Sequence, residues 1–159
     1  MDEQSITNGW TLFTHPCFVE QFNKLQDEVE SLKSRYPDTY LRKRSTNLLY
    51  AVLKTIEDIC RDPTQEKFRQ GDTLGEENRH WFRAKFVQQY RLLFRYSAQH
   101  KTIILAWMND EDTKRAYGSR YDTYRVFSNM LSSGNPPDGW EQLFAESEDT
   151  LLVQGNSGN

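Results

Sequence analysis

The sequence predicts an α+β fold, with an N-terminal helical hairpin packed on a small, mainly antiparallel β-sheet and further helices at the C-terminus. Three observations carry this prediction. Two long apolar stripes at helical spacing occupy residues 16–60. Three runs rich in aromatic and β-branched residues follow between residues 78 and 109. Helical patterns then return and continue to about residue 146, so helices flank the strands on both sides in the chain.

A short strand and two helices are expected first. Residues 10–14 suit a strand, and Pro16 suits the first turn of a helix that Thr14 or His15 caps. Pro37 ends this helix, and a second helix is expected over residues 39–60. The inner side of the second helix is expected to hold seven aliphatic residues: Leu41, Leu48, Leu49, Val52, Leu53, Ile56 and Ile59. A short link between two amphipathic helices favours an antiparallel hairpin.

Residues 78–109 are expected to form a three-stranded antiparallel meander, because residues 87–89 and 98–100 are short enough for hairpin loops. Strand alternation places Trp81, Arg83 and Lys85 on one face. In the next run Arg91 and Arg95 share one face. Residues 102–108 are apolar on both faces, as in a central strand. The stretch contains no Asp or Glu. We therefore expect the sheet to have one apolar face, covered by the hairpin, and one open, cationic face.

Three further helices are expected after the meander. The first begins at Asn109-Asp110-Glu111-Asp112 and ends or kinks at Tyr117-Gly118. Asp122 caps the second, in which Tyr124, Phe127, Met130 and Leu131 are buried. Asp138 caps a short third helix with Trp140, Leu143 and Phe144. Residues 63–80 suit a surface loop. No linker divides residues 1–159, so one domain is expected, with residues 1–8 and 154–159 disordered.

Composition excludes several classes of protein. The formal net charge of −3 argues against a surface coated in base, although a local basic cleft remains compatible with it. No apolar run is long enough to span a membrane and no signal peptide is visible, so we expect no membrane association and a cytoplasmic location. Two cysteines make no disulfide framework, and three scattered histidines indicate neither a metal site nor a cofactor.

The cationic face suits a phosphate chain. Arg and Lys on rigid strands bind phosphate, and Trp81 beside them suits the unpaired bases of single-stranded RNA. RNA is cleaved by its own 2′-OH when one group removes that proton, cations stabilise the added charge and another group protonates the 5′-oxygen. Lys or Tyr can transfer the protons where neighbouring cations lower the pKa. Tyr117 and Arg120 follow the central strand and are expected to fold back over the face.

Several segments resemble a known family. HPCF at 15–18, YRLLFRYS at 90–97, ILAWMNDEDTKRAYG at 104–118, VFSNML at 126–131 and NPP at 135–137 are similar to the YhaV toxins, the toxic half of PrlF–YhaV type II toxin–antitoxin systems. The resemblance runs from about Gly9 to Trp140. More distantly, the order of elements is similar to the RelE superfamily: a helix hairpin, a basic meander and a Tyr in a closing helix.

The resemblance implies a growth-inhibiting toxin that cleaves mRNA in association with translation and the ribosome, as a metal-independent endoribonuclease. It also implies a PrlF-like antitoxin of the AbrB-like, swapped-hairpin type. The complex of the two would repress their own operon, so operator DNA would be bound only by the toxin–antitoxin complex.

The resemblance also implies roles for individual residues. The catalytic residues would be Arg83, Lys85, Arg91 and Tyr117, with Lys85 or Tyr117 in proton transfer and the two arginines stabilising charge. The RNA-binding residues would be Arg79, His80, Trp81, Arg95, Arg120 and Tyr124. Relatives often carry a second Arg just after the central strand, whereas residues 109–111 here are polar or acidic.

A second interpretation stays open at this stage. The basic face could instead belong to a non-catalytic binding module that docks an acidic protein partner or RNA. A docking surface needs charge but no proton-transfer group, so the two interpretations differ in what they require of Lys85 and Tyr117.

Overall fold

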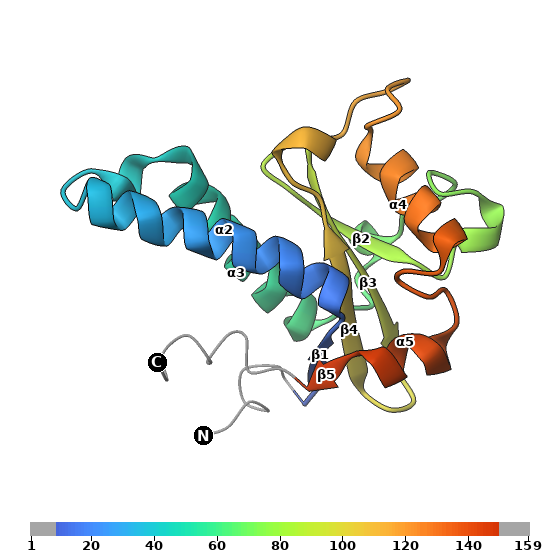
Figure 1. The fold of residues 1–159 in the computed structure, drawn as a ribbon. Coiled ribbons are helices and arrows are strands. Elements are labelled where there is room, and N and C mark those ends of the chain that lie inside the picture. Colours follow the sequence, from blue (N-terminus) through green and yellow to red (C-terminus); the bar gives the residue numbers. More distant parts are fainter. Residues whose placement is uncertain (1–8, 150–159) are drawn as a thin grey trace.

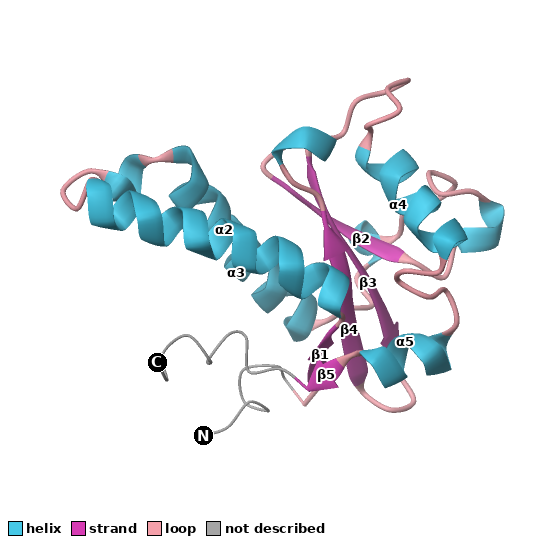
Figure 2. Ribbon diagram, in the orientation of Figure 1, coloured by secondary structure: helices cyan, strands magenta, loops and turns pink. Residues whose placement is uncertain are grey.

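The computed structural model describes residues 9–149 and confirms the α+β class; its arrangement is compatible with the RelE-like fold (Figures 1 and 2). The two expectations of disorder, for residues 1–8 and 154–159, lie outside the described residues. The strands and helices, in chain order, are β1 (Thr11–Thr14), α2 (Pro16–Arg35), α3 (Arg44–Arg61), β2 (Phe82–Phe86), β3 (Tyr90–Ser97), β4 (Thr102–Met108), α4 (Thr123–Ser133), α5 (Trp140–Glu146) and β5 (Glu148–Asp149). None of the helices in residues 9–149 has the length and apolar character needed to cross a membrane.

The sheet has the strand order β2-β3-β4-β1-β5. The predicted meander is confirmed: β2 pairs antiparallel with β3, and β3 with β4, through turns at the predicted positions. A register shift between Leu93 and Phe94 marks a bulge opposite β4. Two pairings were not predicted, namely the parallel pairing of β1 with β4 and the short antiparallel pairing of β5 with β1.

The hairpin of α2 and α3 packs against one face of the sheet and extends well beyond its edge (Figure 1). His15 caps α2, because its Nδ1 accepts a hydrogen bond from the Cys17 backbone N–H at 3.1 Å. Helix α3 begins at Arg44, five residues later than predicted. Residues 40–42 form a 3₁₀ turn and Lys43 is extended, so Leu41 is exposed rather than on the inner side.

The opposite face of the sheet is largely covered, which corrects the expectation that it stays open. Helices α4 and α5 pack on it around a second apolar core that includes Trp81, Leu93, Phe127 and Leu143, each fully buried. The prediction was wrong because a strand pattern tells which side chains share a face, but not which later helices dock there. What remains of the cationic face is the part next to the loop of residues 109–122.

That loop is itself different from the expected helix. Only one 3₁₀ turn forms, at Glu111–Thr113, because Asp110 and Thr113 cap each other reciprocally and Lys114 is extended. The predicted ends of α4 are confirmed: the Asp122 carboxylate accepts from the Tyr124 N–H at 3.1 Å, and Gly134 ends the helix in the left-handed conformation. Tyr124 and Phe127 are buried as predicted, whereas Met130 and Leu131 are only half-buried. Helix α5 is preceded by Gly139 rather than capped by Asp138, whose carboxylate is used elsewhere.

Candidate active site

The hydroxyl of Tyr124 is the centre of a cationic cluster at the start of α4. Two guanidinium groups donate to this one oxygen: Arg83 Nε from β2 at 3.0 Å and Arg91 Nε from β3 at 3.1 Å. Lys85 is the register partner of Arg91 on β2, two residues from Arg83, so the three bases project from adjoining positions of two strands. Helix α4 thus holds the arginines through a phenol rather than through an acid.

Arg91 is the most firmly held of the three. It is 7 % exposed, and its Nη1 donates to the carbonyls of Gln88 at 2.7 Å and Tyr90 at 2.9 Å. Its backbone N–H donates to Asn109 Oδ1 at 2.6 Å. Gln88 has a positive φ of 61°, a strained value for a residue with a side chain, in the tight β2–β3 turn that supplies one of these carbonyls. The guanidinium therefore has a fixed direction before any ligand arrives.

The loop after β4 adds Arg115 and Tyr117. The backbones of Arg115 and Gln89 are joined by a 3.0 Å hydrogen bond, which ties this loop to the β2–β3 turn. The guanidinium of Arg115 lies 3.8 Å from the ring centroid of Tyr117 and 4.9 Å from that of Tyr124. Tyr117 is 89 % exposed, so its phenol is accessible to a ligand while it interacts with Arg115.

Sequence reasoning missed Arg115. The Arg expected just after the central strand was sought at residues 109–111, whereas the structure brings the base at 115 to the cluster because the intervening turn is short. Asp122 accepts from Arg115 Nη1 at 2.5 Å. Burial opposes the charged form, but this carboxylate outweighs it and raises the pKa of Arg115 above its ordinary value.

The electrostatics of the cluster bear most strongly on Lys85. The positive charge of Arg83, then burial and then Arg91 lower the pKa of Lys85, while the nearby Tyr117 phenol acts in the opposite direction. Within residues 9–149, no carboxylate lies within ion-pairing distance of Arg83, Lys85 or Arg91. The structure therefore brings together all four predicted catalytic residues, and three of them are cations that have no acidic partner in the described part of the chain.

Three of the six predicted RNA-binding residues, His80, Trp81 and Arg95, lie in a different cluster, around Asp138. Its Oδ1 accepts from Trp81 Nε1 and interacts with His80 Nε2, both at 2.7 Å. Its backbone carbonyl accepts from Arg95 Nη1, also at 2.7 Å. The guanidinium of Arg95 lies 5.2 Å from the ring of Trp81 and 5.6 Å from that of Trp140. Trp81 is fully buried, so the expectation that it lies open for stacking on an RNA base is wrong.

The remaining three predicted RNA-binding residues differ in position. Arg79 forms an ion pair with Asp72, with Nε 2.9 Å from Oδ1. Arg120 is exposed and lies over the ring of Tyr121, at 5.1 Å. Tyr124 is buried, with its hydroxyl on the two arginines and its ring beside Arg115, so it positions these cations instead of offering a ring to RNA.

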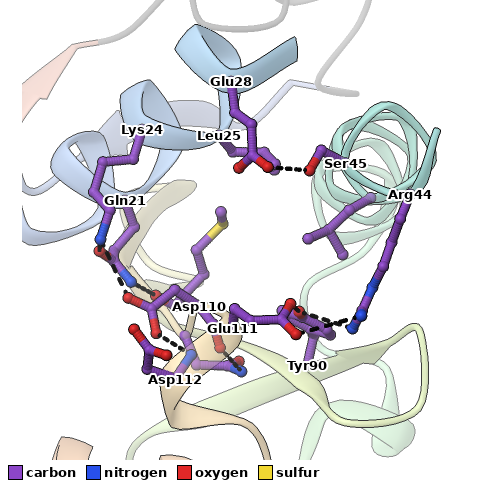
Figure 3. A pocket seen from close by; sticks show the side chains of 13 residues that line it. Gln21, Lys24, Leu25, Glu28, Arg44, Ser45, Tyr90, Asp110, Glu111 and Asp112 are labelled. Carbon is purple, nitrogen blue, oxygen red and sulfur yellow. Dashed lines mark hydrogen bonds and ion pairs between the residues drawn. The ribbon is translucent and has the colours of Figure 1, made fainter. Parts of the chain in front are cut away.

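A separate pocket of about 430 Å³ lies on the hairpin side of the sheet, between α2, α3 and the turn at 110–112 (Figure 3). Its bases are paired: Lys24 with Asp110 at 3.2 Å and Arg44 with Glu111 at 3.3 Å. The Tyr90 hydroxyl donates to Glu111 at 3.0 Å, and burial together with this carboxylate raises the pKa of Tyr90 to about 12. The residues that line this pocket pack against β3, the strand that carries Arg91. Both bases among the described residues of the lining are paired, so the pocket offers no free cation to a ligand.

The geometry defines a class of protein: an α+β protein in which a sheet holds fixed cations next to an exposed phenol, an arrangement that suits a phosphate chain. No cluster of three or more His, Cys, Asp or Glu that could hold a metal ion occurs in residues 9–149. Residues 12–148 match the model of the YhaV toxin family, described as toxins with endonuclease activity of toxin–antitoxin systems. The chain belongs to this family.

Individual relatives agree with the family match. The chain is 50 % identical over 153 residues to the "Ribonuclease toxin YhaV" of Escherichia coli strain K12, covering 94 % of this chain and 99 % of the relative. The "Toxin YhaV" of Escherichia coli O157:H7 gives the same figures. A search of solved structures gives no significant match. Membership of an endonuclease family favours an enzyme over the non-catalytic binding module.

Proposed function

We propose that this chain is an endoribonuclease toxin that cleaves mRNA by attack of the RNA's own 2′-OH, without a metal ion, and so inhibits growth. One observation carries the proposal: Arg83, Lys85 and Arg91 converge without an acidic partner among the described residues, beside the exposed Tyr117. Uncompensated cations attract a phosphate chain, and groups that transfer protons stand among them.

Lys85 is assigned the first proton transfer. Its lowered pKa increases the fraction of neutral amine at physiological pH, and only the neutral amine can accept the proton of the 2′-OH. The 2′-oxygen then forms a bond to phosphorus, the bond from phosphorus to the 5′-oxygen breaks, and a 2′,3′-cyclic phosphate remains. Tyr117 donates its proton to the departing 5′-oxygen, and transfer from Lys85 back to Tyr117 through solvent restores both groups.

Arg83 and Arg91 are assigned to stabilise the negative charge that develops on the phosphoryl oxygens. Their Nε atoms are held by Tyr124, and one Nη1 of each is held by backbone carbonyls, with Arg83 Nη1 donating to Lys67 O at 2.7 Å. The Nη2 groups make no hydrogen bond to another residue in 9–149, so they are the donors left for a ligand. Donors fixed before the reaction stabilise a transition state without paying for reorganisation.

The cellular setting is part of the proposal. We place the protein in the cytoplasm, acting on mRNA during translation at the ribosome, with a PrlF-like, AbrB-type swapped-hairpin antitoxin as its partner. The complex of toxin and antitoxin, not the toxin alone, binds operator DNA. The 50 % sequence identity to YhaV toxins over 94 % of the chain supports these assignments.

The test compares induction of the wild type with Arg83→Ala in cells that lack an antitoxin. We expect the wild type to stop growth and to generate new RNA 5′ ends, and Arg83→Ala to do neither. Arg79→Ala is the matched control, because Arg79 is a nearby arginine already paired with Asp72, and it should stay toxic. Growth arrest with intact mRNA would contradict the nuclease assignment and favour a binding module.

The setting is tested separately. Cleavage of the same mRNA is compared with and without ribosomes, and the toxin is co-expressed with a swapped-hairpin antitoxin. We expect faster cleavage on ribosomes, and a stable complex that suppresses toxicity and alone retards operator DNA. Equal cleavage of naked mRNA would remove the ribosome from the proposal, while failure of the antitoxin to bind would remove that partner.

A further inference from the structure

A pocket of about 360 Å³ opens beside the cationic cluster, between α4 and the loop that precedes β2. Arg115 and Tyr124, which belong to the cluster, form one wall of it. Thr73 and Leu74 contribute from the loop, and the exposed side of α4 contributes the rest. The volume falls in the range of sites that hold small molecules or single nucleotides. A ligand bound at the cluster can therefore extend directly into this pocket.

Three polar side chains of α4 face the pocket without partners of their own. Arg125, Ser128 and Asn129 stand at positions i, i+3 and i+4, which lie on one face of a helix. None of the three side chains makes a hydrogen bond or an ion pair with another residue in 9–149. The pocket thus combines one donor, the guanidinium of Arg125, with two groups that both donate and accept, and no residue in 9–149 satisfies them.

The charge of the pocket is positive. Its one carboxylate, Asp122, is 5 % exposed and is already used by Arg115 Nη1 and by the backbone N–H groups of Ala116 and Tyr124. This leaves the guanidinium of Arg125 as an uncompensated charge. A nucleotide, which joins an anionic phosphate to a base with polar edges, suits this lining better than an apolar or cationic ligand.

We propose that this pocket receives the base of a nucleotide that flanks the scissile phosphate, and that Arg125 and Asn129 select a purine there. The inference rests on the proposed ribonuclease function and adds a specificity site to it. Arg pairs in bidentate fashion with O6 and N7 of guanine, and Asn with N6 and N7 of adenine, so both side chains match purine edges. Unpaired RNA exposes these edges to proteins.

The experiment maps RNA 5′ ends across the transcripts of cells in which the wild type, Arg125→Ala or Asn129→Ala is induced. The wild type should show a purine preference at one position next to the cut. Arg125→Ala should lower cutting beside guanine, and Asn129→Ala cutting beside adenine, each about tenfold, as expected for loss of a bidentate base contact, while cuts at the other bases continue at the wild-type rate. Ser132→Ala, on the exposed side of α4 outside the pocket lining, is the matched control and should leave the preference unchanged.

Different results separate this inference from the proposed function. If the wild type produces no new RNA ends, the ribonuclease proposal itself fails. If the wild type cuts RNA but shows no purine preference, or if both variants keep the wild-type preference, the pocket does not select the base. An equal loss of cutting at all four bases would also overturn the inference, because it would show that the pocket holds the backbone. Melting temperatures of the purified variants establish that each is folded.

Discussion

Two halves of the same sheet face behave in opposite ways. Around Asp138, the guanidinium of Arg95 donates to the Asp138 carbonyl and lies over two indole rings. His80 pairs with the Asp138 carboxylate. Around Tyr124, Arg83 and Arg91 share a neutral hydroxyl and meet no carboxylate among the described residues. The strands supply similar bases to both halves. The chemistry of the residue that α4 or the segment before α5 presents decides whether those bases serve stability or remain available to a substrate.

The contrast also explains the part played by Asp122. Its carboxylate contacts Arg115 and the backbone N–H of Tyr124, so it borders the Tyr124 half. It is committed to capping α4 and to Arg115, with three donors on its two oxygens. The acid therefore shapes the site while leaving the charges of Arg83, Lys85 and Arg91 uncompensated.

The largest expected effect tests the contrast directly. Arg83→Ala should lower the rate of RNA cleavage by roughly 10²–10³-fold, the usual loss when one fixed donor to a developing oxyanion is removed. Arg95→Ala should leave the rate within about threefold but lower the melting temperature, because it removes packing between two indoles. Single-turnover cleavage and thermal unfolding of both variants provide the measurement. Equal loss of cleavage in the two variants would contradict the claim that only the Tyr124 half acts on RNA.

The second prediction asks whether the Tyr124 half is only a charged surface. Lys85→Arg keeps the charge but replaces a titratable amine with a group that stays protonated. Cleavage should fall about 10²-fold, within the range of lost general acid–base catalysis, while RNA affinity changes little. Binding to a non-cleavable RNA with a 2′-O-methyl group at the scissile position is measured alongside the rate. Full activity of Lys85→Arg would exclude Lys85 as the base.

Much of the fold follows from local pattern. The strand alternation correctly assigned Trp81, Arg83 and Lys85 to one face and Ala84 and Phe86 to the other, because side chains of a strand alternate regardless of what packs on them. The helix α2 was predicted at both ends, since Pro16 and Pro37 restrict the backbone locally. The same reasoning placed α4, whose cap and left-handed Gly134 are visible in the sequence.

The candidate site was predictable only in part. Arg83, Lys85, Arg91 and Tyr117 were named because bases and a tyrosine recur in a recognisable order, and the structure brings them together. The burial of Trp81 in the core could not be predicted from the strand pattern, because it depends on α4 and α5, which pack on this face from later in the chain. Arg115 was missed because a helix was expected where one 3₁₀ turn forms.

A third, smaller effect concerns the stability of the Asp138 half. Burial favours the neutral acid, but hydrogen bonds from Trp81 and His80 and the charge of Arg95 outweigh it and lower the pKa of Asp138. The ionised carboxylate therefore stabilises the fold above about pH 4, the ordinary range of such groups, and this contribution is lost as the pH falls through the lowered pKa. The melting temperature of Asp138→Asn should lie below that of the wild type at pH 7, and the gap should close below pH 4. A constant gap from pH 7 to pH 3 would contradict the assignment.

The smallest effect is a shift in the titration of one amine, and it probes the Tyr124 half without any catalysis. Because the charge of Arg83 is the largest influence on Lys85, Arg83→Gln should raise the pKa of Lys85 toward its ordinary value. Arg79→Gln should leave it unchanged, since Arg79 is neutralised by Asp72. NMR titration of the Lys85 side chain in the three proteins measures the shift. A Lys85 pKa that does not respond to Arg83→Gln would show that the cations of this half are screened from one another by solvent, and the reason for choosing Lys85 as the base would be gone.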